Sequence, residues 1–206
     1  EHGLGVPKNL RKAFHCYRCA SKQGDPNAQM QLGFCYFDGE CTLKNRPKGI
    51  KWLRIAANSG YSAAKYFLGV YLLTGQGTTA NPNKGLAYLK EAADHGFEYA
   101  LSKLSIIYGL GQYGIPKNKP EAVRYLRILA ERGKADAQHL LGCHYLEGVG
   151  VPQDEEKAFQ FFSLSADQNF PQGVRSLAMC YEKGYGIPKD RSRAATLYQW
   201  AASLPA

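Results

Sequence analysis

The sequence predicts an all-α solenoid built from helix-turn-helix repeats of about 36 residues. A helix-capping Asn or Asp recurs at steps of 36 or 37 residues. Apolar residues between the caps follow a spacing of four, which keeps their side chains on one face of a helix. The capping positions are Asn9, Asn45, Asn81, Asn118, Asp154 and Asp190. Because six copies stay in register, we expect a stacked array in which each repeat contacts its neighbours.

The repeat unit is clearest between residues 137 and 168. Its first helix places Leu141 and Tyr145 on one face, a Gly-rich hinge follows at residues 148–152, and Asp154 caps the second helix. We expect a single solenoid domain over residues 1–206, with a partial repeat at 1–27 and full repeats at 28–63, 64–99, 100–136, 137–172 and 173–206.

Large side chains recur at fixed positions in both helices of the repeat. The first helix has an aromatic residue or Leu at Tyr36, Leu72, Tyr108, Tyr145 and Tyr181. The second helix has a large residue at Trp52, Tyr88, Tyr125, Phe161 and Leu197. A single repeat cannot bury these side chains, so stacking must do so. We therefore interpret this stripe as core packing rather than as a binding platform.

The charge of the chain is uneven. The net charge is +9, and residues 1–60 carry ten Lys or Arg against four Asp or Glu. A solvated face is the plainest interpretation. A surface for an acidic partner protein or an anionic membrane is the alternative. Nucleic acid is not expected, since no nucleic-acid-binding motif accompanies the charge. The basic residues concerned are Lys8, Arg11, Lys12, Lys44, Arg46, Lys48 and Lys51.

The repeat pattern resembles that of the Sel-one-like repeat, a relative of the tetratricopeptide repeat. The residues that carry this resemblance are Leu141, Gly142, Tyr145, Gly148, Gly150, Val151, Pro152, Asp154, Lys157 and Ala158. The resemblance covers nearly the whole chain. It implies a right-handed α-solenoid, or superhelix, whose first helices line a concave face.

The predicted concave face supplies the candidate partner-binding residues. On each first helix, the positions one and three residues after the initial small residue are expected to point away from the core. They vary from repeat to repeat and include apolar residues, as a protein-recognition groove would; packing against the next first helix is the alternative. These candidates are Gln29, Gln31, Lys65, Phe67, Leu101, Lys103, Gln138 and Leu140.

The cysteines leave two interpretations open. Cys16 and Cys19 form a C-x-x-C pair in the middle of a predicted helix, whereas redox pairs sit at a helix start. Zinc binding with Cys35 and Cys41 is disfavoured, because that second pair is too widely spaced. A disulfide among Cys16, Cys19 and Cys35 remains one expectation, and free thiols that act as small apolar side chains remain the other.

No catalytic constellation is visible in the sequence. His139 and His144 are five residues apart, which does not suit a helical metal pair. The glycines at 148 and 150 resemble part of a phosphate loop, but no strand precedes them and no Lys-Ser/Thr follows. We expect neither enzyme activity nor a cofactor or metal.

Together these features predict a non-enzymatic scaffold that binds a partner protein in its concave groove. The resemblance adds a narrower hypothesis, an immunity protein that neutralises a lipase effector of bacterial type VI secretion, so that the partner is a toxin. Binding to anionic lipid or polysaccharide through the basic residues is a third hypothesis, which includes contact with a membrane surface. A periplasmic or exported location is favoured over the cytoplasm.

Overall fold

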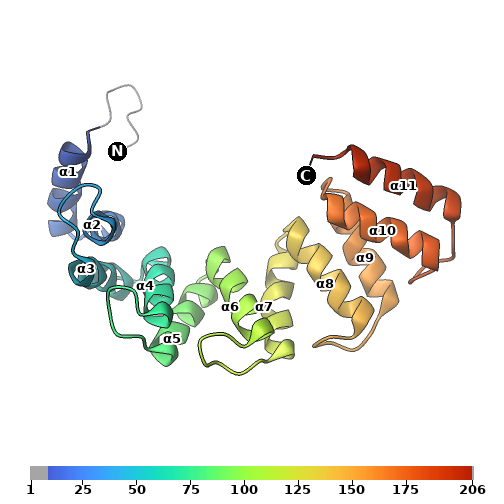
Figure 1. The fold of residues 1–206 in the computed structure, drawn as a ribbon, viewed down its shortest axis with the longest axis horizontal. Helices are drawn as coiled ribbons and strands as arrows, with labels where there is room; N and C mark the ends of the chain where they lie inside the picture. Colours follow the sequence, from blue (N-terminus) through green and yellow to red (C-terminus); the bar gives the residue numbers. More distant parts are fainter. Residues whose placement is uncertain (1–8, 206) are drawn as a thin grey trace. The chain divides into compact units, whose positions relative to one another are not determined.

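The computed structural model describes residues 9–205, and in that range the chain forms eleven α-helices and no strand (Figure 1). We call the first helix of each repeat the A helix and the second the B helix. The A helices are α2 (Pro26–Asp38), α4 (Ser62–Thr74), α6 (Glu98–Leu110), α8 (Ala135–Glu147) and α10 (Pro171–Lys183). The B helices are α1 (Leu10–Lys22), α3 (Arg46–Asn58), α5 (Pro82–Asp94), α7 (Lys119–Glu131), α9 (Glu155–Ala166) and α11 (Arg191–Ser203). The predicted all-α repeat fold is confirmed.

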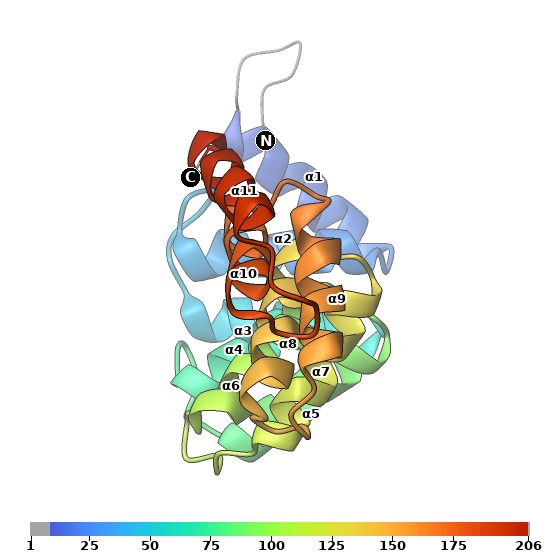
Figure 2. The same cartoon turned by 90° about the vertical axis from the view of Figure 1, so that its right-hand side faces the viewer.

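The helices fall into two compact units, residues 1–100 and residues 101–206. In unit 1, consecutive helices from α1 to α5 pack in sequence order. In unit 2, the same holds from α7 to α11, and α10 lies between α9 and α11 (Figures 1 and 2). Whether the two units act as the single predicted domain stays a prediction.

The predicted caps start the B helices as expected. The side chain of each capping Asn or Asp accepts a hydrogen bond from the backbone amide three residues later, as Asn118 does from Glu121 at 3.1 Å. This bond satisfies an amide that has no partner within the helix. The cap also closes the repeat, because its own amide donates to a carbonyl near the end of the preceding A helix. In α8 and α9 that bond joins Asp154 N to Tyr145 O at 2.9 Å.

The A and B helices of a repeat approach closely where both carry glycine. A Cβ atom added to Gly69 in α4 would lie 2.9 Å from the carbonyl oxygen of Gly85 in α5. A Cβ atom added to Gly85 would lie 2.8 Å from the carbonyl oxygen of Gly69. Gly33 and Gly49 face each other in the same way between α2 and α3. These contacts fix the register of the two helices, since no side chain separates them.

The core follows from this packing. In unit 1 it is a cluster of buried side chains from α2, α3 and α4, including Phe37, Leu53 and Leu68. In unit 2 the large side chains of paired helices stack, with ring centroids 6.1 Å apart for Tyr108 and Tyr125. The interpretation of the recurring large side chains as core packing is thereby confirmed for Tyr108 and Tyr125, which are both buried. None of the helices between residues 9 and 205 has the length and apolarity that crossing a membrane requires.

We predict different effects on stability for two glycine substitutions in A helices. Gly69→Ala should lower the free energy of unfolding by about 1–3 kcal/mol, because its methyl group would meet the backbone of α5. Gly109→Ala should leave stability unchanged or raise it by up to about 1 kcal/mol, because its methyl group would meet only the Cβ of Ala122 at 3.8 Å. Urea unfolding measures both, and equal effects of the two substitutions would contradict the close approach.

Candidate functional site

The structure divides the predicted partner-binding residues into two groups. The residues one position after the small residue are buried, with exposed fractions of 9% or less. They are Gln29, Lys65, Leu101 and Gln138. The expectation that these four point away from the core is therefore wrong, although their contribution to partner binding through other atoms stays a prediction.

The buried positions face the neighbouring B helices. Gln138 Nε2 donates to Ala130 O at the end of α7 at 3.2 Å, and Gln138 Oε1 accepts from Gln168 Nε2 just after α9 at 2.7 Å. Gln29 Nε2 points to Ser21 O of α1 at 3.4 Å. Side chains on a helix lean toward its N-terminus, and here that direction carries them under the ends of the B helices rather than onto an open face.

The residues three positions after the small residue are accessible. Gln31, Phe67 and Lys103 are half-buried, and Leu140 is 49% exposed. Lys103 Nζ donates to the hydroxyl of Tyr113 at 3.4 Å. This half of the prediction agrees with the surface of the chain, and whether these residues bind a partner stays a prediction.

Phe67 belongs to a row of contacting aromatic rings in unit 1, which we call the aromatic row. Its members are Phe34 of α2, Tyr66 and Phe67 of α4, Phe97 just before α6, and Tyr99 in the first turn of α6. The Phe34 and Phe67 centroids are 4.8 Å apart, edge to face, and the Tyr66 and Phe97 centroids are 5.5 Å apart. Tyr99 is 69% exposed. Of the aromatic row, only Phe67 was predicted from the sequence. The other four rings stand at different positions of the repeat, and only their contacts in the folded chain bring them together.

The basic residues lie at the N-terminal halves of two B helices and in the loop before one of them. Arg11 and Lys12 are in α1, Lys44 precedes α3, and Arg46, Lys48 and Lys51 are in α3; all six are exposed. Lys8 is outside the described residues. Lys48 Nζ lies 4.2 Å from the ring centroid of Tyr36. Arg46 likewise lies over the ring of Phe37, at 5.3 Å from its centroid. Cations at a helix N-terminus oppose the helix dipole, and these two ring contacts act in the opposite direction.

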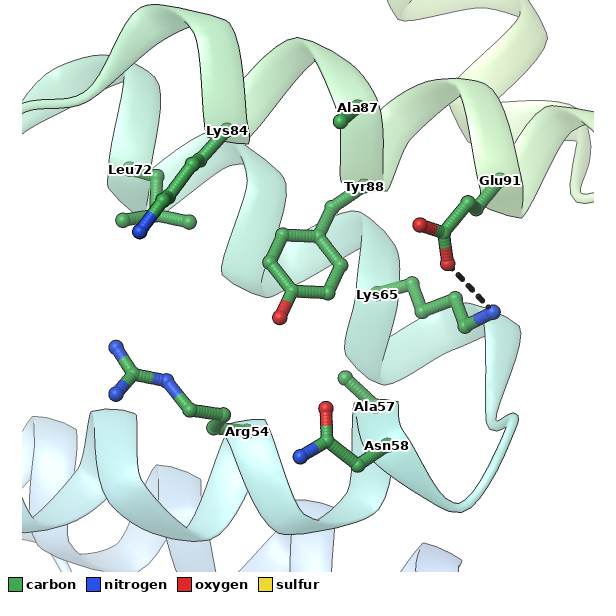
Figure 3. A pocket seen from close by; sticks show the side chains of 9 residues that line it. All are labelled: Arg54, Ala57, Asn58, Lys65, Leu72, Lys84, Ala87, Tyr88 and Glu91. Carbon is green, nitrogen blue, oxygen red and sulfur yellow. Dashed lines mark ion pairs between the residues drawn. The ribbon is translucent and has the colours of Figure 1, made fainter.

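A groove of about 640 Å³ opens between α3 and α5, with α4 as its floor (Figure 3). Arg54 rises into it from α3, and Tyr88 of α5 points its hydroxyl toward α3. Lys65 of α4 closes one end through an ion pair with Glu91 of 2.8 Å. The volume falls in the range of ligand-binding clefts. The full set of lining residues is Arg54, Ala57, Asn58, Lys65, Leu72, Lys84, Ala87, Tyr88 and Glu91.

His139 joins helices of unit 2 through a small polar cluster. Its Nε2 lies 3.1 Å from Ser176 Oγ of α10 and 3.7 Å from Cys143 Sγ. Its ring also contacts Phe162 and Phe170. Burial lowers the pKa of His139 below its ordinary value of 6.5, since the neutral ring is favoured away from water. Within residues 9–205, no group of three or more His, Cys, Asp or Glu side chains could hold a metal ion.

The six cysteines, all within residues 9–205, form no disulfide in this structure, and Cys19 Sγ lies 3.6 Å from His15 Nε2. Cys16 and Cys19 are exposed free thiols on α1, whereas Cys35 is buried in α2. A bridge from either to Cys35 is thus not formed in this structure, and it stays a prediction for oxidising conditions. Burial raises the pKa of Cys180 to about 12, which keeps that thiol protonated and unreactive at neutral pH.

Comparison with known proteins matches the repeat to a family. The family model of the Sel1 repeat fits the chain at residues 1–25, 26–61, 62–97, 98–134, 135–170 and 171–205. The chain belongs to the Sel1 repeat family. Each of its Sel1 repeats after the first begins at the first residue of an A helix. Sel1 repeats form a scaffold fold that is typical of protein–protein interaction and is generally not enzymatic.

Two solved Sel1 structures resemble the chain closely in fold. The protective antigen c5321 of uropathogenic Escherichia coli has a TM-score of 0.79 and 30% identity, over 95% of this chain and 41% of that one. A Sel1 repeat protein from Oxalobacter formigenes has a TM-score of 0.79 and 29% identity, over 96% and 83%. The chain thus spans less than half the length of the Escherichia coli antigen.

A more distant match is the immunity protein Pa5087 of Pseudomonas aeruginosa, with a TM-score of 0.48 and 19% identity over 96% of this chain and 77% of that one. No curated protein matches the sequence significantly.

We predict that His139 makes unit 2 less stable in mild acid. Its folded-state pKa lies below its unfolded value, so its neutral form stabilises the fold above pH 6.5 and that contribution is lost as the pH falls toward the folded pKa. The melting temperature should therefore drop more between pH 7.5 and pH 5.5 for the natural chain than for His139→Gln. Parallel pH dependences of the two proteins would rule this out.

Proposed function

We propose that the chain is a non-enzymatic scaffold that holds a partner protein on the aromatic row of unit 1. The observation that carries the proposal is the row itself, in which four rings from three A helices and the ring of Phe97 form a continuous chain of contacts. Aromatic side chains dominate the energy of protein interfaces, and the ones that matter most lie at the centre of a rigid patch. The family fold is consistent with this role.

The row is suited to binding because it is ordered before a partner arrives. Phe34 and Phe67 pack against the core of unit 1, so their rotamers are restricted in the free protein. Tyr66 bridges from Phe67 to Phe97 and Tyr99, which brings the row out to the surface. A partner that covers Tyr99 loses little side-chain entropy on the scaffold side, because the neighbouring rings are already fixed.

We predict that Tyr99→Ala weakens partner binding by at least about 2 kcal/mol, the size expected for an interface hot spot. The tagged protein, Tyr99→Ala and Leu43→Ala would be used to co-purify partners from the cells that encode the chain. Leu43 is the matched control, because it is apolar and 90% exposed but lies outside the row. A stoichiometric partner that is lost with Tyr99→Ala and retained with Leu43→Ala supports the proposal, and equal retention by both variants refutes it.

The exposed basic residues of α1 and α3 favour a second candidate, binding to anionic lipid or polysaccharide. Binding of this kind is screened by salt, whereas an apolar interface is not. Repeating the co-purification at about 0.5 M salt separates the two, since the Debye length there falls to a few ångströms. If the retained partner is a secreted hydrolase that loses activity in the complex, the scaffold acts as an immunity protein, and an exported location would follow that of its partner.

A further inference from the structure

One position of the repeat departs from its copies beside the groove of unit 1. Near the end of each A helix the chain places a large side chain whose carbonyl accepts the amide of the next cap. Four of the five copies have tyrosine there, and the copy in α4 has leucine. The five residues are Tyr36, Leu72, Tyr108, Tyr145 and Tyr181.

Tyr145, the copy of this position in α8, makes three kinds of contact. Its ring stacks on Phe161 of the following B helix, with centroids 5.7 Å apart and planes 4° from parallel. Its hydroxyl accepts a hydrogen bond from Arg127 Nη2 of the preceding B helix at 3.3 Å. Lys157 Nζ lies 5.5 Å from its ring centroid.

The same contacts recur in part elsewhere. Tyr108 stacks on Tyr125. A cation lies over Tyr36 and over Tyr181, supplied by Lys48 at 4.2 Å and by Arg193 at 4.6 Å. The stack and the cation therefore belong to the repeat and not to one copy of it.

The groove of unit 1 contains the counterparts of all three contacting residues, but not the tyrosine. Arg54 stands where Arg127 does, Lys84 where Lys157 does, and Tyr88 where Phe161 does. Leu72 is shorter than tyrosine and has no hydroxyl. Within residues 9–205, Arg54 and Lys84 form no ion pair or ring contact, and the ring of Tyr88 pairs with no other ring. Figure 3 shows Arg54, Lys84 and Tyr88 around the open space beside Leu72.

We propose that the groove binds a tyrosine side chain of the partner protein, which takes the place of the tyrosine that α4 lacks. Its ring would stack on Tyr88, its hydroxyl would accept from Arg54, and Lys84 would lie over the ring. This inference rests on the proposed scaffold function and adds a second contact point to it.

The chemistry of the groove favours tyrosine over a carboxylate. An acidic side chain would satisfy Arg54 and Lys84 but would leave the ring of Tyr88 uncovered. A tyrosine meets all three, because its ring is apolar on its face and its oxygen accepts a hydrogen bond. In the other repeats, the same kinds of cation and ring contact surround a tyrosine that the A helix itself supplies.

The first test supplies the missing side chain from the protein itself. Leu72→Tyr should fill the groove, stack on Tyr88 and raise the melting temperature. The same variant should bind the partner about tenfold more weakly, because the groove is then occupied. Arg54→Gln and Tyr88→Ala provide a second route that does not depend on how Leu72→Tyr folds. Both should weaken partner binding, since both remove a group that meets the incoming tyrosine.

The second test uses small probes and does not need the partner. N-acetyltyrosine amide, N-acetylphenylalanine amide and N-acetylglutamate amide would be titrated into isotope-labelled protein, with NMR shifts followed at Tyr88. The tyrosine probe should bind about three- to tenfold more tightly than the phenylalanine probe, and Arg54→Gln should remove this difference. Leu72→Tyr should abolish the shifts. Tighter binding of the glutamate probe would overturn the proposal in favour of an acidic segment, and no shift at Tyr88 with any probe would overturn it outright.

The two proposals fail in different ways. If Tyr99→Ala abolishes partner binding while Leu72→Tyr, Arg54→Gln and Tyr88→Ala leave it unchanged, the scaffold function stands and the groove inference is wrong. If the groove variants weaken binding and Tyr99→Ala does not, the partner is held in the groove, and the aromatic row is not the binding surface.

Discussion

The close approach of the A helix to the B helix within a repeat is the constraint on which unit 1 depends. Gly69 and Gly85 bring the backbones of α4 and α5 so near that a single added methyl group would meet a carbonyl oxygen. With no side chain between them, the two helices can slide very little along each other. The side chains of α4 that line the groove or join the aromatic row therefore have a fixed position along α5.

The same constraint explains why the A helix serves two surfaces. One side of α4 lies below α3 and α5, where it carries Lys65 and Leu72. Another side carries Tyr66 and Phe67, which contact rings from the helices before and after it in the chain. Lys65 is held under the B helices because its ammonium meets Glu91, an acceptor that the neutral glutamines of the equivalent positions do not need. A substitution at one repeat position, such as Lys65 in place of glutamine, therefore changes one defined contact and leaves the backbone of the repeat as it is.

The positions of the helices could be predicted well from the sequence. Cap residues and hinge glycines act locally, so the positions of the B helices followed from the sequence alone, as Asn118 and the start of α7 show. Which side chains lie exposed on the surface could be predicted less well. Gln29 and Gln138 were expected in the open, because spacing along a helix does not tell how far a side chain leans back under its neighbours. The aromatic row was missed for a related reason, since Phe34 and Tyr99 are far apart in the chain and occupy unlike positions in the repeat.

In a repeat protein, the residues of one repeat can be compared with their counterparts in the others, and the groove of unit 1 shows the use of this comparison. In a protein without repeats, Arg54 and Lys84 would be two more exposed cations, and exposed cations contribute little to stability. Here their counterparts show what such side chains do when a tyrosine is present. An empty groove costs the fold little stability, because water hydrates the charges of Arg54 and Lys84. The groove can therefore stay open in the free protein. Binding of a tyrosine from outside would then use counterparts of the three side chains that contact Tyr145 in unit 2.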